Sequence, residues 1–138
     1  MAYCNTSNTG LKTTWATDLN TAIGTNATVK FYTGTYPADP SVAATGTLLA
    51  TLTCSASAFG VVTNGVSGGA NPYITANTIT SANGVATGTP GYCRISTSGG
   101  TAVVDLDVAA SGASMNMTPD TITSGAPVSV TSLVLTVD

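Results

Sequence analysis

Aspartate is the only acidic side chain in this sequence, and its positions limit the chemistry that the chain can perform. The chain has no glutamate and no histidine, and it has only three basic residues. General acid–base catalysis draws mostly on His, Glu, Asp, Lys, Tyr or Cys, so two of the usual groups are missing. The composition therefore disfavours an enzyme. The six aspartates are Asp18, Asp39, Asp105, Asp107, Asp120 and Asp138.

Asp105 and Asp107 form the closest pair of carboxylates. They stand two residues apart in an alternating segment, so a strand would point both to the same face. They could ligate Ca²⁺ or act as an acid pair, and an acid pair in a cleft would indicate an enzyme such as a wall hydrolase. Calcium needs six to eight oxygen ligands, and no calcium-loop motif surrounds them, so a solvated strand face is favoured. Arg94 in the preceding segment is a candidate cross-strand partner, worth less than about 1 kcal/mol if exposed.

Nucleophile, phosphate and metal motifs are missing from the sequence. It contains no GxSxG, P-loop or GxGxxG pattern. A serine or cysteine nucleophile without histidine would need a lysine base, and Lys12 and Lys30 lie near no recognisable nucleophile. Transition-metal sites depend on His and Cys, and the three cysteines are widely spaced. We therefore expect no catalytic residue, no metal and no cofactor.

The cysteines are Cys4, Cys54 and Cys93, and their spacing matches no metal or CxxC pattern. Cys54 and Cys93 lie in apolar segments, which favours buried, reduced thiols that act as small hydrophobes. A Cys54–Cys93 disulfide is the alternative. Cys4 stands near a terminus, and if it reacts, an intermolecular bond in an assembled particle is the expected use.

One segment has the periodicity of a helix. Leu11, Trp15, Leu19 and Ile23 recur every four residues, as an apolar stripe does on a helix. Thr9 is a candidate N-cap and Gly24 a candidate C-terminal glycine, so the sequence predicts a helix over residues 11–24. Trp15 is expected to anchor this helix on a sheet rather than to stack on a ligand.

The remainder of the chain reads as short strands separated by turns. Candidate strands cover residues 27–33, 48–54, 59–63, 73–79, 92–96, 101–108, 115–117 and 128–137, and turn signals include Asn64-Gly65 and Gly68-Gly69. About eight short strands indicate a mainly β fold, an antiparallel β-sandwich or a jelly-roll-like barrel. We expect a single domain over residues 1–138, with an N-terminal segment (1–10), the helix (11–24) and the β-sandwich (25–138).

The low charge indicates a protein that associates with other protein. Only 7% of the residues are charged, against roughly 25% in typical domains. Three basic residues argue against nucleic acid binding, and no apolar run reaches the ~20 residues that a membrane helix needs. The polar start of the chain does not resemble a secretory signal, so synthesis in a cytoplasm is expected. A neutral surface of hydroxyls and amides suits a permanent assembly.

Several strand and turn motifs of the chain form a distinctive set. They are the KFYTGTYP segment from Lys30, the GTLLATLTC segment from Gly46, the AFG turn from Ala58, YCRI from Tyr92, GGTAVVD from Gly99, and the strand from Val128 to Val137. These motifs resemble those of a group of small, uncharacterised structural proteins of tailed bacteriophages and prophages. Cys54 and Cys93 depart from that pattern, which has ordinary hydrophobes at these positions. This departure leaves open whether the chain forms disulfides. The resemblance implies a virion component and brings no catalytic residues.

The resemblance and the composition together favour a capsid decoration or cement protein, made in the host bacterial cytoplasm and located in the virion. Its partners would be the major capsid protein or other virion proteins, and it would form a homo-oligomer, with a trimer as the working guess. The alternative is a tail, neck or fibre component or a host-glycan-binding module, supported only by tyrosine-rich and asparagine-rich loops. Tyr36 and Tyr73 converging on one groove would favour that alternative. The tyrosines are Tyr3, Tyr32, Tyr36, Tyr73 and Tyr92.

Overall fold

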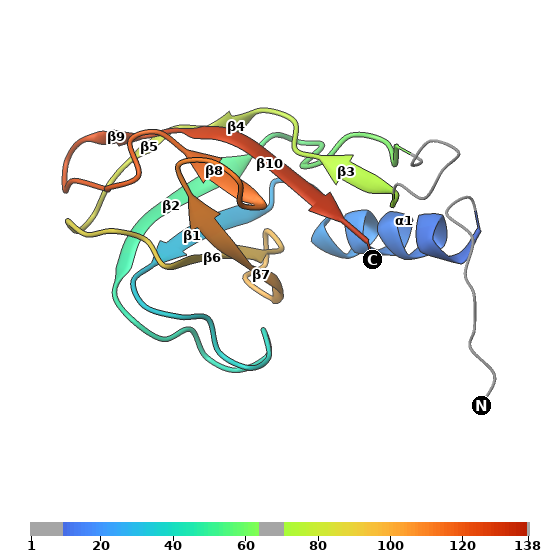
Figure 1. The fold of residues 1–138 in the computed structure, drawn as a ribbon, viewed down its shortest axis with the longest axis horizontal. Helices are drawn as coiled ribbons and strands as arrows, with labels where there is room; N and C mark the ends of the chain where they lie inside the picture. Colours follow the sequence, from blue (N-terminus) through green and yellow to red (C-terminus); the bar gives the residue numbers. More distant parts are fainter. Residues whose placement is uncertain (1–9, 64–70, 138) are drawn as a thin grey trace.

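A computed structural model describes residues 10–63 and 71–137 of the chain (Figure 1). Cys4, the candidate N-cap Thr9 and the expected turns at Asn64-Gly65 and Gly68-Gly69 lie outside the described residues. The described part contains one helix and ten strands, so the prediction of a mainly β fold is confirmed.

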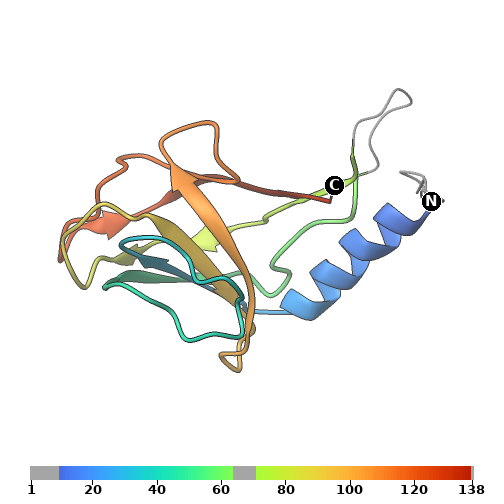
Figure 2. The same cartoon turned by 60° about the horizontal axis from the view of Figure 1, so that its bottom comes forward.

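Helix α1 spans Leu11–Ile23, one residue shorter than expected. Gly10 precedes it without a side-chain cap. Gly24 ends it with a φ of 73°, in the left-handed region that favours glycine, and the Gly24 N–H donates to the carbonyl oxygen of Asn20. In Figure 2 the helix runs obliquely away from the end of the sheet.

Trp15 does not anchor α1, which corrects the sequence interpretation. Its side chain is 46% exposed, whereas Ala16 and Ile23 are fully buried. The reason is geometric: with 3.6 residues per turn, each four-residue step rotates the stripe by about 40°. The stripe that meets the core at Ile23 has therefore turned outward by the time it reaches Trp15 and Leu11.

The strands are short, and the sequence placed most of them within one or two residues. The expected strand at 59–63 is reduced to isolated bridges at Phe59 and Thr63, and the one at 73–79 is divided in two. The strands are β1 Thr28–Tyr32, β2 Leu48–Cys54, β3 Tyr73–Thr75, β4 Ile79–Thr80, β5 Ala82–Asn83, β6 Tyr92–Ser96, β7 Ala102–Ala109, β8 Met115–Met117, β9 Pro127–Val128 and β10 Val130–Thr136.

Eight of these strands form one curled sheet in the order β3-β10-β8-β7-β6-β1-β2-β4, and β5 and β9 form a small second sheet. The large sheet curves into half of a barrel, in keeping with a sandwich-like or barrel-like fold (Figure 1). Among the named strands, the expectation of purely antiparallel pairing is wrong for β7 and β8, which pair in parallel. Their connection, residues 110–114, is much shorter than an ordinary parallel crossover.

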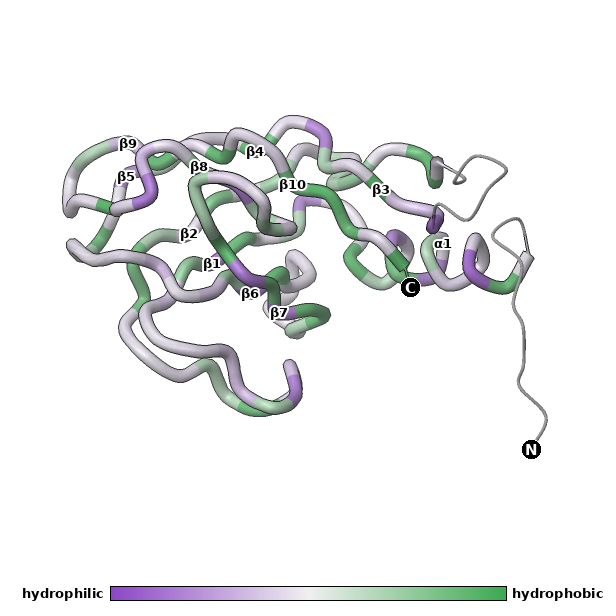
Figure 3. The backbone as a smooth tube through the Cα atoms, viewed as in Figure 1, coloured by the Kyte–Doolittle hydropathy of each residue, from purple (hydrophilic) through white to green (hydrophobic). Residues whose placement is uncertain are grey.

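The core lies on the concave face of the large sheet. Val29 and Phe31 of β1 alternate with Lys30 and Tyr32, as the period of a strand requires. Val29 and Phe31 belong to one hydrophobic cluster with buried residues of the other strands, with Ile23 of α1, and with Ile122 and Val128. Figure 3 shows hydrophobic residues along β10.

A long connection between β1 and β2 covers part of the large sheet on the face opposite the core. We call residues 33–47 the strap. Its base is closed where the Thr33 N–H donates to the Thr47 carbonyl oxygen at 3.1 Å, and the Thr47 N–H donates to Thr33 Oγ1 at 2.9 Å. The strap is the element that positions the polar cluster described next.

Candidate functional site

Strand β6 is buried on both of its faces, which distinguishes it from the other strands. All five residues from Tyr92 to Ser96 are buried. Cys93 and Ile95 point into the core. Tyr92 and Arg94 alternate with them and therefore lie on the face that the strap covers, where both bind the backbone of the strap.

Arg94 and Asp105 form a buried ion pair in this cluster. Arg94 Nε donates to Asp105 Oδ1 and Nη2 donates to Oδ2, both at 2.7 Å, which is the bidentate geometry. The two side chains are only 7% and 3% exposed. The remaining nitrogen, Nη1, donates to the carbonyl oxygen of Val42 in the strap at 2.8 Å. Every guanidinium nitrogen is therefore engaged, and the hydrogen bonds to Asp105 raise the pKa of Arg94.

Tyr92 holds the strap at a second point. Its hydroxyl donates to the Thr45 carbonyl oxygen at 2.8 Å and accepts from the Thr45 N–H at 2.9 Å. Its ring stacks on Tyr32, with centroids 5.3 Å apart, and the Tyr36 ring meets it edge-on at 6.3 Å. Burial raises the pKa of Tyr32, with the neighbouring Tyr92 adding to the effect. These contacts fix the strap, and the Tyr92 hydroxyl both donates and accepts a hydrogen bond within them.

The two neighbouring aspartates have different surroundings. Asp105 is buried against Arg94, whereas Asp107 is exposed and its Oδ1 lies 3.5 Å from the Ser114 N–H. The structure therefore does not place them together in a cleft, and the acid pair that would indicate a hydrolase does not form. The expectation of a solvated face is correct for Asp107 and wrong for Asp105, because the strap excludes water from one end of that face.

Cys54 and Cys93 are buried, free thiols. Strand β1 lies between β2 and β6, which separates them by two strand spacings, about 10 Å. Cys93 pairs with Phe31, whereas Thr53 beside Cys54 pairs with Thr28 near the other end of β1. A disulfide needs Cα atoms within about 7 Å, so the alternative of a Cys54–Cys93 bridge is wrong.

The Cys93 thiol is expected to make the folded protein less stable at alkaline pH. Burial raises its pKa in the folded protein, with Asp105 and Asp107 adding to the effect, while the unfolded chain ionises near pH ~8.5. The thiol's contribution to the free energy of unfolding is therefore fully present below that pH and is lost as the pH rises above it. The reason is that the thiol of the unfolded chain loses its proton at a lower pH than the thiol of the folded protein. We expect urea titrations at pH 7.5 and 9.5 to show that Cys93→Ala loses about 1.4 kcal/mol less than the wild type over this interval. Equal losses in the two proteins would contradict this assignment.

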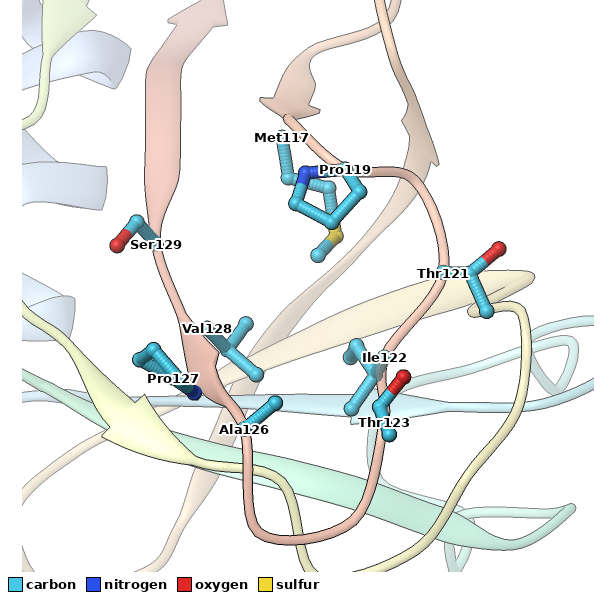
Figure 4. Close-up of a pocket in the computed structure, with 9 residues that line it drawn as sticks. All are labelled: Met117, Pro119, Thr121, Ile122, Thr123, Ala126, Pro127, Val128 and Ser129. Atoms are coloured by element: carbon cyan, nitrogen blue, oxygen red, sulfur yellow. The ribbon is translucent and has the colours of Figure 1, made fainter.

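Two hollows in the described part of the chain have no ionisable side chain in their lining. The first is a cavity of about 50 Å³ where Met117, Ile122 and Val128 point toward one another (Figure 4). Pockets for small-molecule ligands usually measure about 300–1,000 Å³, so this cavity is too small. The second is a shallow groove of about 250 Å³ between the C-terminal end of α1 and the segment from Ala56 to Phe59.

Among residues 10–63 and 71–137, no three His, Cys, Asp or Glu side chains gather in a way that would hold a metal ion. In the same ranges, no helix is long and apolar enough to cross a membrane. The buried side-chain nitrogen and oxygen atoms of the described residues all have hydrogen-bond partners.

The tyrosines that a glycan-binding groove would need are separated. Tyr36 lies in the strap, in contact with Tyr92 of β6. Tyr73 lies in β3 at one edge of the sheet, and β10, β8 and β7 stand between β3 and β6. The convergence that would favour a glycan-binding module is therefore not found.

Sequence reasoning missed the role of the strap. It left the interval between the candidate strands at 27–33 and 48–54 without a role and considered the tyrosines only for a glycan-binding groove. The available signal was the alternation in β6, where the large polar residues Tyr92 and Arg94 interleave with Cys93 and Ile95. Large polar side chains on the second face of a central strand indicate that something covers that face.

Comparison of the chain with protein-family models, with curated proteins and with solved structures gives no match.

Proposed function

We propose that this protein is a structural component of a bacteriophage virion that acts by packing against other virion proteins. The observation that carries the proposal is the character of its surface. Large apolar side chains are exposed on a surface that has few charges, with Leu11, Trp15, Tyr36 and Val42 between 43% and 54% exposed. Burying such side chains in an interface is favourable, and neutral hydroxyls beside them avoid the cost of desolvating ions.

The rigid presentation of this surface supports the same proposal. The one ion pair between described residues is used internally, to fix the strap on the sheet. A preorganised loop loses little conformational entropy when it binds a partner. The motifs that resemble phage structural proteins support a location in the virion. Capsid decoration is the specific role that we propose within the particle.

Quantitative mass spectrometry of purified particles tests the proposal. We expect the protein at hundreds of copies per particle, together with the major capsid protein, and immunogold labelling over the head. A dozen or fewer copies at the neck or tail would contradict capsid decoration and support the tail or neck alternative. Absence from particles that carry the head and tail proteins would overturn the virion proposal altogether.

A further inference from the structure

Strand β7 has a free edge over most of its length. It pairs with β6 from Ala102 to Asp107, but its pairing with β8 is confined to Val108 and Ala109. Over residues 102–106, no other described strand pairs with the side of β7 that faces away from β6. We call this side of residues 102–106 the β7 edge. Unpaired backbone groups along such an edge are a template for another strand.

The alternation of backbone hydrogen bonds shows where the unpaired groups lie. The Tyr32 carbonyl oxygen of β1 accepts from the Gly91 N–H, so Tyr32 and, two residues earlier, Lys30 direct their backbone groups toward β6. Lys30 pairs with Arg94, which therefore uses its backbone groups in that contact. Asp105, the partner of Arg94 in β7, directs its own N–H and C=O away from β6. Among residues 10–63 and 71–137, no backbone group bonds to them.

The exposure of Asp105 shows that these backbone groups are accessible. Its side chain is only 3% exposed because it is buried against Arg94, yet the residue as a whole is partly exposed. The accessible part of Asp105 is therefore its backbone. The neighbouring strand differs: β6 is buried throughout, whereas each residue of β7 is at least partly exposed.

Apolar side chains border the β7 edge on the core side of the sheet. Val104 and Leu106 are only partly buried. Their partners in β6, Ile95 and Cys93, are fully buried. An extended segment bound at the edge would cover the two apolar side chains while its backbone pairs with Asp105. Only an extended polypeptide offers N–H and C=O groups at the spacing of a strand, so the edge fits a β-strand.

We propose that the β7 edge of one copy pairs antiparallel with the β7 edge of a second copy. The edge is self-complementary, because a two-fold axis sets the N–H and C=O groups of one strand opposite the C=O and N–H groups of the other. It also joins the two apolar borders. Charge does not oppose the contact: Asp105 is neutralised by Arg94, and antiparallel pairing keeps the two Asp107 side chains at opposite ends.

A contact of this kind is isologous, so it closes with two copies and gives a dimer in place of the trimer that was the working guess. The inference rests on the proposed assembly function and names its first partner, a second copy of the chain.

Hydrogen exchange on the purified full chain tests the contact directly. We expect sedimentation velocity to show reversible dimerisation of the wild type. The Asp105 amide should exchange rapidly in the monomer and become protected as the concentration rises through the dimerisation range. The amides of β6, which is paired on both sides, should keep the same protection throughout. An Asp105 amide that is already protected in the monomer would contradict the free edge.

Charges placed at Val104 test the two-fold symmetry. Val104→Lys and Val104→Asp should each weaken dimerisation about tenfold, because like charges would meet across the contact. An equimolar mixture of the two variants should recover most of the affinity, because opposite charges then face each other. Val130 of β10 is the matched control, since it is also partly buried against the core and lies outside the β7 edge. Val130→Lys and Val130→Asp should dimerise as the wild type does, and circular dichroism checks that each variant is folded.

A wild type that stays monomeric at about 1 mM would overturn the inference. So would a mixture of the Val104 variants that associates no better than either variant alone. Protection of Asp105 in assembled particles but not in concentrated solution would identify a strand of a different protein as the occupant and would also overturn it. These outcomes are independent of the particle experiment: a protein found in virions that is monomeric in solution retains the proposed function and loses this contact. Dimerisation together with absence from particles gives the reverse result.

Discussion

We expect Asp105→Ala to lower the free energy of unfolding by about 3–5 kcal/mol. The substitution leaves the Arg94 guanidinium buried beneath the strap without its counter-ion, and a guanidinium does not lose its proton in proteins. Removing one partner of a buried pair costs more than the pair itself contributes, because the remaining charge stays desolvated. Urea unfolding followed by circular dichroism measures the change.

Asp107 provides the matched control for this experiment. It lies two residues away on the same face of β7 and is exposed, so Asp107→Ala should change stability by no more than about 0.5 kcal/mol. The double variant Arg94→Met with Asp105→Leu should be more stable than Asp105→Ala alone, because it leaves no unpaired charge. Equal effects of the two aspartate substitutions would show that burial of the Arg94–Asp105 pair does not determine the loss of stability.

We expect Gly91→Ala to destabilise the protein by about 3 kcal/mol. A Cβ at this position would overlap the carbonyl oxygen of Gly34, at the point where the strap leaves β1. The Gly91 N–H donates to the Tyr32 carbonyl oxygen at 2.8 Å, which holds the two backbones together. A backbone atom cannot move aside as a flexible side chain can, so the base of the strap would have to shift. Urea unfolding again measures the loss.

Gly99 is the control for the effect of adding a methyl group. A Cβ there would make only an ordinary contact of 3.7 Å with Thr97 Oγ1, so Gly99→Ala should change stability by no more than about 0.5 kcal/mol. If Gly91→Ala were as well tolerated as Gly99→Ala, the close approach of strap and sheet would not hold in solution.

Both predictions concern the same structural unit. The Arg94–Asp105 pair and the Gly91–Gly34 approach fix the strap at different points on the sheet. Each variant should therefore loosen the attachment of the strap to the sheet.

The alternation of side chains was sufficient to identify the β fold. In β1, β2 and β6 the expected bounds agree with the observed ones to within one residue, because successive side chains of a strand point to opposite faces of the sheet and their types alternate accordingly. Gly24 was correctly placed at the end of the helix because a positive φ favours glycine. Local patterns of this kind depend on neighbours in sequence, and for that reason they can be read without the structure.

The sequence alone determined a mainly β chain with one helix and few charged side chains. Only the tertiary structure decided that Asp105 is buried and Asp107 exposed, that Cys54 and Cys93 lie too far apart to bond, and that Trp15 faces outward. It also decided that β7 and β8 run parallel and that residues 33–47 cover β6. These outcomes depend on which segments meet across long sequence separations, and a side chain's identity does not reveal what will cover it.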